Sequence, residues 1–304
     1  MNEGFPEPAG PAHSVSRPPP PAIDYLVIGH VTKDVAPEAP GGFVYGGTVS
    51  FASLAARNLG RRAAVLTRAG AVPGLAAHLS GIVLRVLPAA ETTTFENRYT
   101  PRGRVQYVRA AAPPIPPEAV PAAWRRVAVA HLGPVAQEVP AAVAEVFSPQ
   151  TLVGATPQGW LRTWDYTGLV RPAPWREVER ALARIDVLVF SAEDVGGDLD
   201  LVRRYAEMAK LAVVTENRHG CTVWQCGRRQ HFPAFEVDEV DPTGAGDVFA
   251  TAFLLAYAQT RDVAAAARFA NCAASFTVEG FGTAAIPTLE RVEERLKSGR
   301  LRAE

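Results

Sequence analysis

The chain has 304 residues, of which 48 % are hydrophobic and 20 % charged, a composition that suits a globular domain with a large core. Lys and Arg number 31 and Asp and Glu number 31, so the net charge is zero. This balance argues against nucleic-acid or membrane-surface binding driven by bulk charge.

The sequence also argues against targeting segments, disulfides and zinc. No run approaches the ~20 apolar residues of a membrane span, and the N-terminus lacks a signal-peptide pattern, so we expect a cytoplasmic protein. Residues 1–22 are rich in proline and are predicted to be a disordered tail before one domain, residues 23–304. Cys221, Cys226 and Cys272 are too sparse for a disulfide framework or a zinc site, and we expect buried thiols.

Apolar strands alternate with helices along most of the chain, which predicts an α/β fold with a mostly parallel sheet covered on both faces. The expected strands lie within 23–30, 63–70, 81–88, 126–133, 151–155, 186–194 and 211–217. The expected helices lie near 48–59, 137–147, 175–184, 198–210, 248–258 and 288–301.

Two segments interrupt this alternation. Residues 92–109 contain two polar strands around a Pro/Gly turn, and such a hairpin does not suit a buried parallel sheet, so we expect a lid beside the main domain. The lid is predicted to include residues near 35–46 and 92–110. Residues 157–168, "PQGWLRTWDYTG", are predicted to form a long loop near the strand ends.

The stretch "DPTGAGD", residues 241–247, precedes an apolar helix and carries the most specific chemistry in the chain. Gly244, Ala245 and Gly246 would present free backbone N–H groups at the helix N-terminus, which is an anion site. Asp247 on the same turn is predicted to be a general base that takes a proton from an attacking hydroxyl. The alternative is that Asp247 only caps the helix.

Several segments together resemble the PfkB/ribokinase family of small-molecule kinases. "DPTGAGD" is similar to the family's C-terminal signature and "GGTVSFASLAARNLG" to its N-terminal glycine signature. "VIGHVTKD", "VVTENRHGC" and "FANCAASFTVEGFG" resemble its first strand, its nucleotide-side strand and its adenine-pocket helix. The resemblance spans residues 23 to about 290, and "GHVTKD" with "PTGAGD" also resembles the inositol-kinase-like branch. It implies a ribokinase-like three-layer α/β/α sandwich with a small β-hairpin lid.

The resemblance also implies roles for individual residues. Asp34, with Lys33, Gly46, Gly47, Asn97 and Gln158, would contact the substrate. Thr215, Asn217, Gly220, Thr243 and Asn271 would surround the nucleotide. Mg²⁺ would arrive with ATP, served by Asp194 or Glu193 through water or phosphate, and Asp241 would bind a monovalent cation such as K⁺.

The sequence departs from the family pattern at four places. Ser50 or Phe51 replaces an asparagine after the paired glycines, which argues against ribokinase itself, and Ala155 replaces an acid on the middle strand. "SAED" stands for the usual Asn-x-x-Glu, so the magnesium residue is ambiguous. Asn217 replaces a glycine, and asparagine tolerates the positive φ of such a turn.

We therefore expect an ATP-dependent kinase, a monomer or homodimer, that phosphorylates a hydroxyl of a cyclitol such as myo-inositol or of a sugar. A nucleoside kinase is the second expectation. The rival from another class is a non-catalytic ligand-binding module that kept the fold, because fold alone does not fix function. The sequence contains no Walker or dinucleotide-binding glycine pattern.

Overall fold

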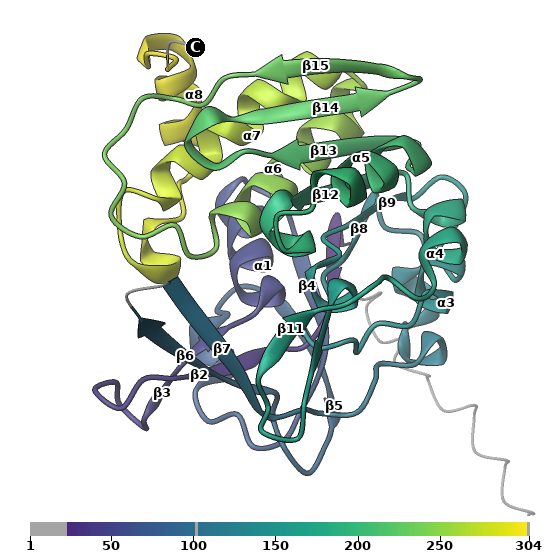
Figure 1. Cartoon of the computed structure of the whole chain (residues 1–304), viewed down its shortest axis with the longest axis vertical. Coiled ribbons are helices and arrows are strands. Elements are labelled where there is room, and N and C mark those ends of the chain that lie inside the picture. Colours follow the sequence, from purple (N-terminus) through teal and green to yellow (C-terminus); the bar gives the residue numbers. More distant parts are fainter. Residues whose placement is uncertain (1–22, 101–102, 303–304) are drawn as a thin grey trace, which may run out of the picture.

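The computed structural model describes residues 23–100 and 103–302, and the predicted tail, residues 1–22, lies outside them. A nine-stranded sheet forms the middle layer of a three-layer α/β/α arrangement (Figure 1). Its order is β15 (Arg228–Phe232), β14 (Cys221–Gln225), β13 (Leu211–Thr215), β12 (Val187–Ser191), β9 (Leu152–Ala155), β8 (Val129–Leu132), β1 (Tyr25–Ile28), β4 (Ala63–Ala69) and β5 (Val83–Pro88). β14 pairs antiparallel with both neighbours, and the other pairs are parallel.

Helices cover both faces of this sheet because its central strands are apolar on both sides. One face packs on α1 (Thr48–Asn58), α6 (Ala245–Thr260) and α7 (Val263–Thr277), with α8 (Leu289–Ser298) outside them. The other face packs on α3 (Ala142–Glu145), α4 (Val178–Arg184) and α5 (Leu199–Met208), while α2 (Leu75–His78) follows β4. Alternate residues of β1 divide between the two cores, Tyr25 and Val27 facing α6 and Leu26 and Ile28 facing away.

A second sheet forms the lid beneath the helical layer, in the order β3 (Phe43–Gly46), β2 (Thr32–Val35), β6 (Thr94–Thr100) and β7 (Gly103–Ala110) (Figure 1). β2 pairs parallel with β6, so Asp34 lies beside Phe95. The predicted hairpin over 92–109 is therefore confirmed as β6 and β7. The lid begins at Thr32, before the predicted boundary near 35, so Asp34 belongs to a lid strand.

The structure corrects the predicted loop over 157–168. A short 3-10 helix, η3 (Gln158–Leu161), leads into β10 (Arg162–Trp164), which pairs antiparallel with β11 (Val170–Pro172). The turn between them closes on the Asp165 carboxylate, which accepts the backbone N–H groups of Thr167 and Leu169. Val108 N–H donates to the Gly168 carbonyl at 2.8 Å, so this hairpin docks on the lid strand β7.

Two smaller expectations also differ from the structure. The helix predicted over 137–147 is only α3, because the Glu138 carboxylate accepts the backbone N–H groups of Val135 and Ala136 and Pro140 stands just before the helix. Cys221 and Cys272 are buried as expected, whereas Cys226 lies exposed in the turn between β14 and β15.

Candidate active site

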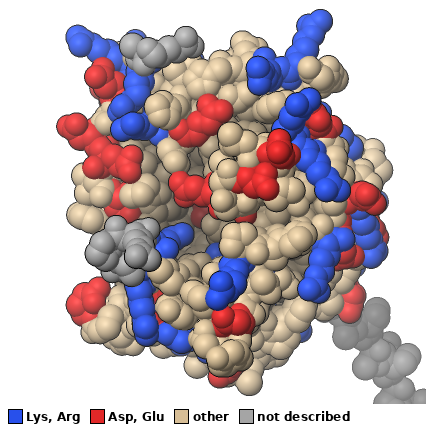
Figure 2. Space-filling model, in the orientation of Figure 1, with Lys and Arg blue, Asp and Glu red and all other residues tan. Residues whose placement is uncertain are grey.

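The carboxyl ends of the parallel strands meet at one edge of the main sheet, where an open α/β sheet commonly binds ligands. The N-terminal turns of α1 and α6 reach the same region, and the lid lies next to it (Figure 1). A hollow opens near the centre of this face, with acidic side chains along its upper border and basic ones below it (Figure 2).

The α6 turn forms as the sequence predicted, and Gly244 is its N-terminal residue with φ +79°. Only glycine suits this position, because a Cβ on Gly244 would stand 2.1 Å from Phe51 Cδ1. Within the described part of the chain, no hydrogen bond occupies the N–H groups of Gly244, Gly246 or Asp247. The N–H of Ala245, which was also predicted to bind the anion, donates to the Pro242 carbonyl at 3.1 Å. Three donors at this helix end are therefore available to bind an anion.

Asp247 lies on the first turn of α6 and is largely surrounded by protein. The pKa of its carboxyl is raised from 3.8 to about 6, mainly by burial and also by the Asp194 carboxylate, while a hydrogen bond from the Thr48 hydroxyl and the charge of Arg162 act in the opposite direction. A carboxylate whose pKa lies near neutrality is suited to general-base catalysis. Thr48 was not among the predicted residues, although it directly follows the paired glycines.

A buried polar chain supports α6 from below. The Tyr25 hydroxyl lies 2.6 Å from His131 Nδ1 and 3.0 Å from the Thr251 hydroxyl. The Thr251 hydroxyl in turn donates to the backbone carbonyl of Asp247 at 2.8 Å. Burial lowers the pKa of His131 to about 3, so the imidazole is neutral at physiological pH. These hydrogen bonds tie the first turns of α6, which carry Asp247, to strands β1 and β8.

Asp34 faces the site from the lid strand β2. Its Oδ1 accepts a hydrogen bond from the Thr32 hydroxyl at 3.0 Å, and burial raises the pKa of its carboxyl while Arg104 and Arg162 lower it. Gly46 allows this approach, because a Cβ there would lie 2.5 Å from Asp34 Oδ2. Gly47 (φ +82°) then turns the chain into α1.

The other predicted substrate residues separate into two groups. Asn97 accepts a hydrogen bond from the Gln106 side chain, and Gln158 accepts one from Arg162, so both join one network between the lid and the main domain. The Lys33 side chain lies on the other face of β2 from the Asp34 carboxylate, because successive strand residues face opposite sides. The Lys33 ammonium lies 4.7 Å from the Phe43 ring centroid.

The position of the family's asparagine is filled without a polar contact to the hollow. The Ser50 hydroxyl donates to the Gly46 carbonyl at 2.7 Å, and the Phe51 ring packs against Gly244. At this helix start the Ser50 hydroxyl is therefore occupied, and the polar group that reaches Asp247 is the Thr48 hydroxyl.

Three of the predicted nucleotide residues, Thr215, Asn217 and Gly220, lie at or just after the end of β13, whereas Thr243 lies just before α6 and Asn271 lies within α7. Thr215 ends β13, and the 3-10 turn that follows contains Asn217 with φ +51° before Gly220 with φ +105°. The predicted tolerance of positive φ at Asn217 is thus confirmed. The Asn271 amide instead donates to the Phe232 and Pro233 carbonyls, at 3.0 and 3.2 Å, and so holds the neighbouring wall.

The two acids predicted to serve magnesium lie on the turn after β12. Asp194 Oδ2 accepts the backbone N–H and the hydroxyl of Ser191, which leaves Oδ1 available, and Glu193 accepts the Asn217 amide at 3.0 Å. Among the described residues no group of three or more acidic, His or Cys side chains could hold a metal by itself. Magnesium bound with nucleotide needs only one or two carboxylates, so this pair fits it. Asp241 Oδ1 accepts the Thr243 N–H at 2.9 Å.

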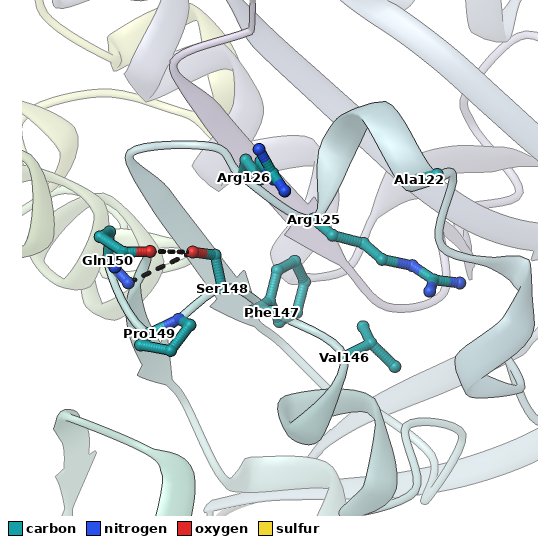
Figure 3. Close-up of a pocket in the computed structure, with 8 residues that line it drawn as sticks. All are labelled: Ala122, Arg125, Arg126, Val146, Phe147, Ser148, Pro149 and Gln150. Atoms are coloured by element: carbon teal, nitrogen blue, oxygen red, sulfur yellow. Dashed lines mark hydrogen bonds between the residues drawn. The ribbon is translucent and has the colours of Figure 1, made fainter.

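A separate pocket of about 690 Å³ lies at the opposite edge of the sheet, where β8 and β9 begin (Figure 3). It is lined by Ala122, Arg125, Arg126, Val146, Phe147, Ser148, Pro149 and Gln150. Since it is remote from Asp247 and the lid, it is not the candidate active site.

No helix in the described residues is long and apolar enough to cross a membrane.

Comparisons with known proteins find similarity to a kinase family in part of the C-terminal half. Residues 175–289 match the family described as pfkB family carbohydrate kinase. The ribokinase of Bacillus subtilis is 45 % identical over 89 residues, which are 29 % of this chain and 30 % of that protein. A nucleoside kinase of Methanocaldococcus jannaschii is 32 % identical over 99 residues, 32 % of this chain and 33 % of that one. The matched stretches thus span about a third of these relatives.

Solved structures establish the fold over nearly the whole chain. An engineered pyrophosphate-dependent myo-inositol kinase superimposes with a TM-score of 0.72 at 23 % identity, over 90 % of this chain and 98 % of that one. Ribokinase from Arabidopsis thaliana, solved with ribose and ATP, gives a TM-score of 0.69 at 19 % identity, over 91 % and 99 %. The predicted ribokinase-like fold is confirmed.

Proposed function

This chain carries a PfkB-family segment on a ribokinase fold, and from that premise we propose that it is an ATP-dependent kinase acting on a hydroxyl of a small polyhydroxy compound. One observation carries the proposal. A largely buried carboxyl, Asp247, whose pKa is raised to about 6, stands on the same turn as three backbone N–H groups without a hydrogen-bond partner in the described residues. General base and anion site are the two parts that phosphoryl transfer requires from a protein.

The proposed step follows from that arrangement. The Asp247 carboxylate accepts the proton of the substrate hydroxyl while the oxygen attacks the terminal phosphorus of ATP, and the bond from phosphorus to the ADP oxygen breaks. The N–H groups of Gly244, Gly246 and Asp247 stabilise the charge on the transferring group. Asp194 and Glu193 are the residues that would hold magnesium bound with ATP, which would supply positive charge to the phosphates.

The acceptor is proposed to lie between Asp34, the Gly46–Gly47 turn and the lid. The Asp34 carboxylate suits hydroxyl groups that donate hydrogen bonds, and the amides of Asn97 and Gln158 add polar contacts. A cyclitol or a sugar fits this set, in keeping with the myo-inositol and ribose named for two proteins of the same fold. A nucleoside is the second candidate, supported by the nucleoside kinase among the relatives.

Turnover of Mg-ATP against a panel of acceptors tests the proposal. The panel holds myo-inositol, common hexoses and pentoses, their monophosphates, and nucleosides, each with and without K⁺ because of the proposed cation site at Asp241. We expect strong turnover on one class of acceptor and a loss on the order of 10²–10⁴ in Asp247→Asn. ATP binding without turnover on any acceptor, and with thermal stabilisation by one of them, would support the non-catalytic binding module instead.

A further inference from the structure

Arg162, the first residue of β10, is a buried cation beside the candidate site, although no sequence pattern singled it out. Its side chain is 8 % exposed, and its charge acts on the carboxyls of both Asp34 and Asp247. A buried arginine is costly unless each part of its guanidinium is paired, so its partners show what it does.

The guanidinium bonds in three directions. Nε donates to the Val135 carbonyl at 2.6 Å, one terminal nitrogen donates to Gln106 Oε1 at 2.7 Å, and the other donates to Gln158 Oε1 at 3.1 Å. The guanidinium carbon also lies 4.9 Å from the ring centroid of Phe95 in β6. Val135 and Gln158 belong to the main domain, whereas Gln106 and Phe95 belong to the lid, so Arg162 joins the two.

These hydrogen bonds also fix the orientation of the Gln106, Gln158 and Asn97 side-chain amides, that is, whether the oxygen or the nitrogen faces each partner. A guanidinium only donates hydrogen bonds, so both glutamines must turn their carbonyl oxygens toward Arg162. The Gln106 amide nitrogen then donates to Asn97 Oδ1 at 2.9 Å. Because the Asn97 oxygen faces Gln106, the Asn97 amide nitrogen points away from Gln106. Among the described residues no hydrogen bond occupies Nε2 of Gln158 or Nδ2 of Asn97.

We propose that Arg162 is a positioning residue that determines acceptor specificity, by orienting Gln158 and Asn97 as hydrogen-bond donors and by holding the lid to the main domain. The inference rests on the proposed kinase function. Carboxylates at Asp34 and Asp247 accept hydrogen bonds, while the two amide N–H groups donate them. A hydroxyl does both, so such a site selects an uncharged compound with several hydroxyls.

Three variants separate this role from a purely structural one. Arg162→Met removes both the positive charge and the three hydrogen bonds. Arg162→Lys keeps the charge, but its single ammonium cannot bond Val135, Gln106 and Gln158 together. Gln158→Glu keeps an acceptor for Arg162 and replaces the donating amide N–H of Gln158 by an oxygen. Arg171→Met on the neighbouring strand β11 is the matched control, since that arginine is 63 % exposed and reaches Asp165 only at 3.6 Å.

The kinetic measurement uses Mg-ATP with myo-inositol and with ribose. All three variants are expected to raise the KM for the acceptor by about tenfold or more, the loss of one hydrogen bond to a fixed donor, while the KM for ATP stays within about twofold. Arg171→Met should match the unmodified chain. An unchanged acceptor KM in folded Arg162→Lys and Gln158→Glu proteins would overturn the proposal.

A second measurement needs no turnover. Amide hydrogen exchange of β6 and β7 in the free protein should accelerate by about tenfold or more in Arg162→Met relative to Arg171→Met, because the lid loses its tie. Equal exchange in both would overturn the positioning role. If the unmodified chain phosphorylates no acceptor while its lid exchange responds as expected, the proposed function fails and the tie between lid and domain stands.

Discussion

Replacing the proposed base by its neutral isostere should stabilise the protein while it abolishes turnover. Asp247→Asn keeps the shape of the side chain and an oxygen that can accept the Thr48 hydroxyl hydrogen bond, but it removes the buried charge. A carboxyl that must ionise in a protein environment destabilises the folded state at neutral pH, and the variant relieves this penalty.

The size of the effect follows from the pKa. The folded-state pKa of Asp247 is about 6 against an ordinary 3.8, which corresponds to about 3 kcal/mol at 1.36 kcal/mol per pH unit. The side chain keeps partial exposure toward the hollow, so about 3 kcal/mol is an upper bound. The sign is set by proton binding: the folded state holds the proton more tightly, so wild-type stability is lost as pH rises from about 3.8 to about 6.

Urea unfolding of both proteins between pH 4 and pH 8 measures this dependence. The variant should be more stable by about 1–3 kcal/mol at pH 8, and the difference should vanish toward pH 4. Its turnover should fall on the order of 10²–10⁴. A variant that is no more stable than wild type at pH 8, or a difference independent of pH, would refute the argument that Asp247 is held in a desolvated site.

Further predictions concern pH and the α6 turn. The kcat of wild type should fall below about pH 6 as the Asp247 carboxylate takes up a proton. Thr48→Val should move this acid limb of the pH–rate profile to higher pH, because the variant lacks the hydrogen bond that lowers the pKa of Asp247. Coinciding pH–rate profiles of the two proteins would contradict the role of Thr48. Gly244→Ala should destabilise the protein by about 2–5 kcal/mol through positive φ and collision with Phe51, as measured by urea unfolding. Gly246→Ala is the matched control, since a Cβ there meets no atom within 4 Å, and equal stability of the two variants would speak against the steric argument.

The sequence was most informative where local chemistry and fold coincide. Pro242, Gly244 and the apolar run after Asp247 predicted a helix start that the structure places at Ala245. The hairpin over 92–109 was also predictable, because its polar strands could not belong to a sheet buried on both faces. In both cases neighbouring residues along the chain carried the signal.

The missed residues act across the chain. Arg162 meets Gln106 from 56 positions away, and Tyr25 meets Thr251 from 226 positions away, so no local pattern could reveal either contact. The sequence predicts a loop where β10 lies, because a strand of three residues is too short to show a visible alternation. Lys33, predicted to contact the substrate together with Asp34, instead faces Phe43, because adjacent strand residues face opposite sides.

The most direct test of the central claim is phosphoryl transfer itself, measured as ADP and phosphorylated product formed from Mg-ATP and the acceptor panel by the wild type and by Asp247→Asn. We expect product with one class of polyhydroxy acceptor, reduced by a factor on the order of 10²–10⁴ in the variant. Equal product formation by the two proteins would contradict the assignment of Asp247 as the base. ATP binding without any product from the wild type would contradict the kinase function.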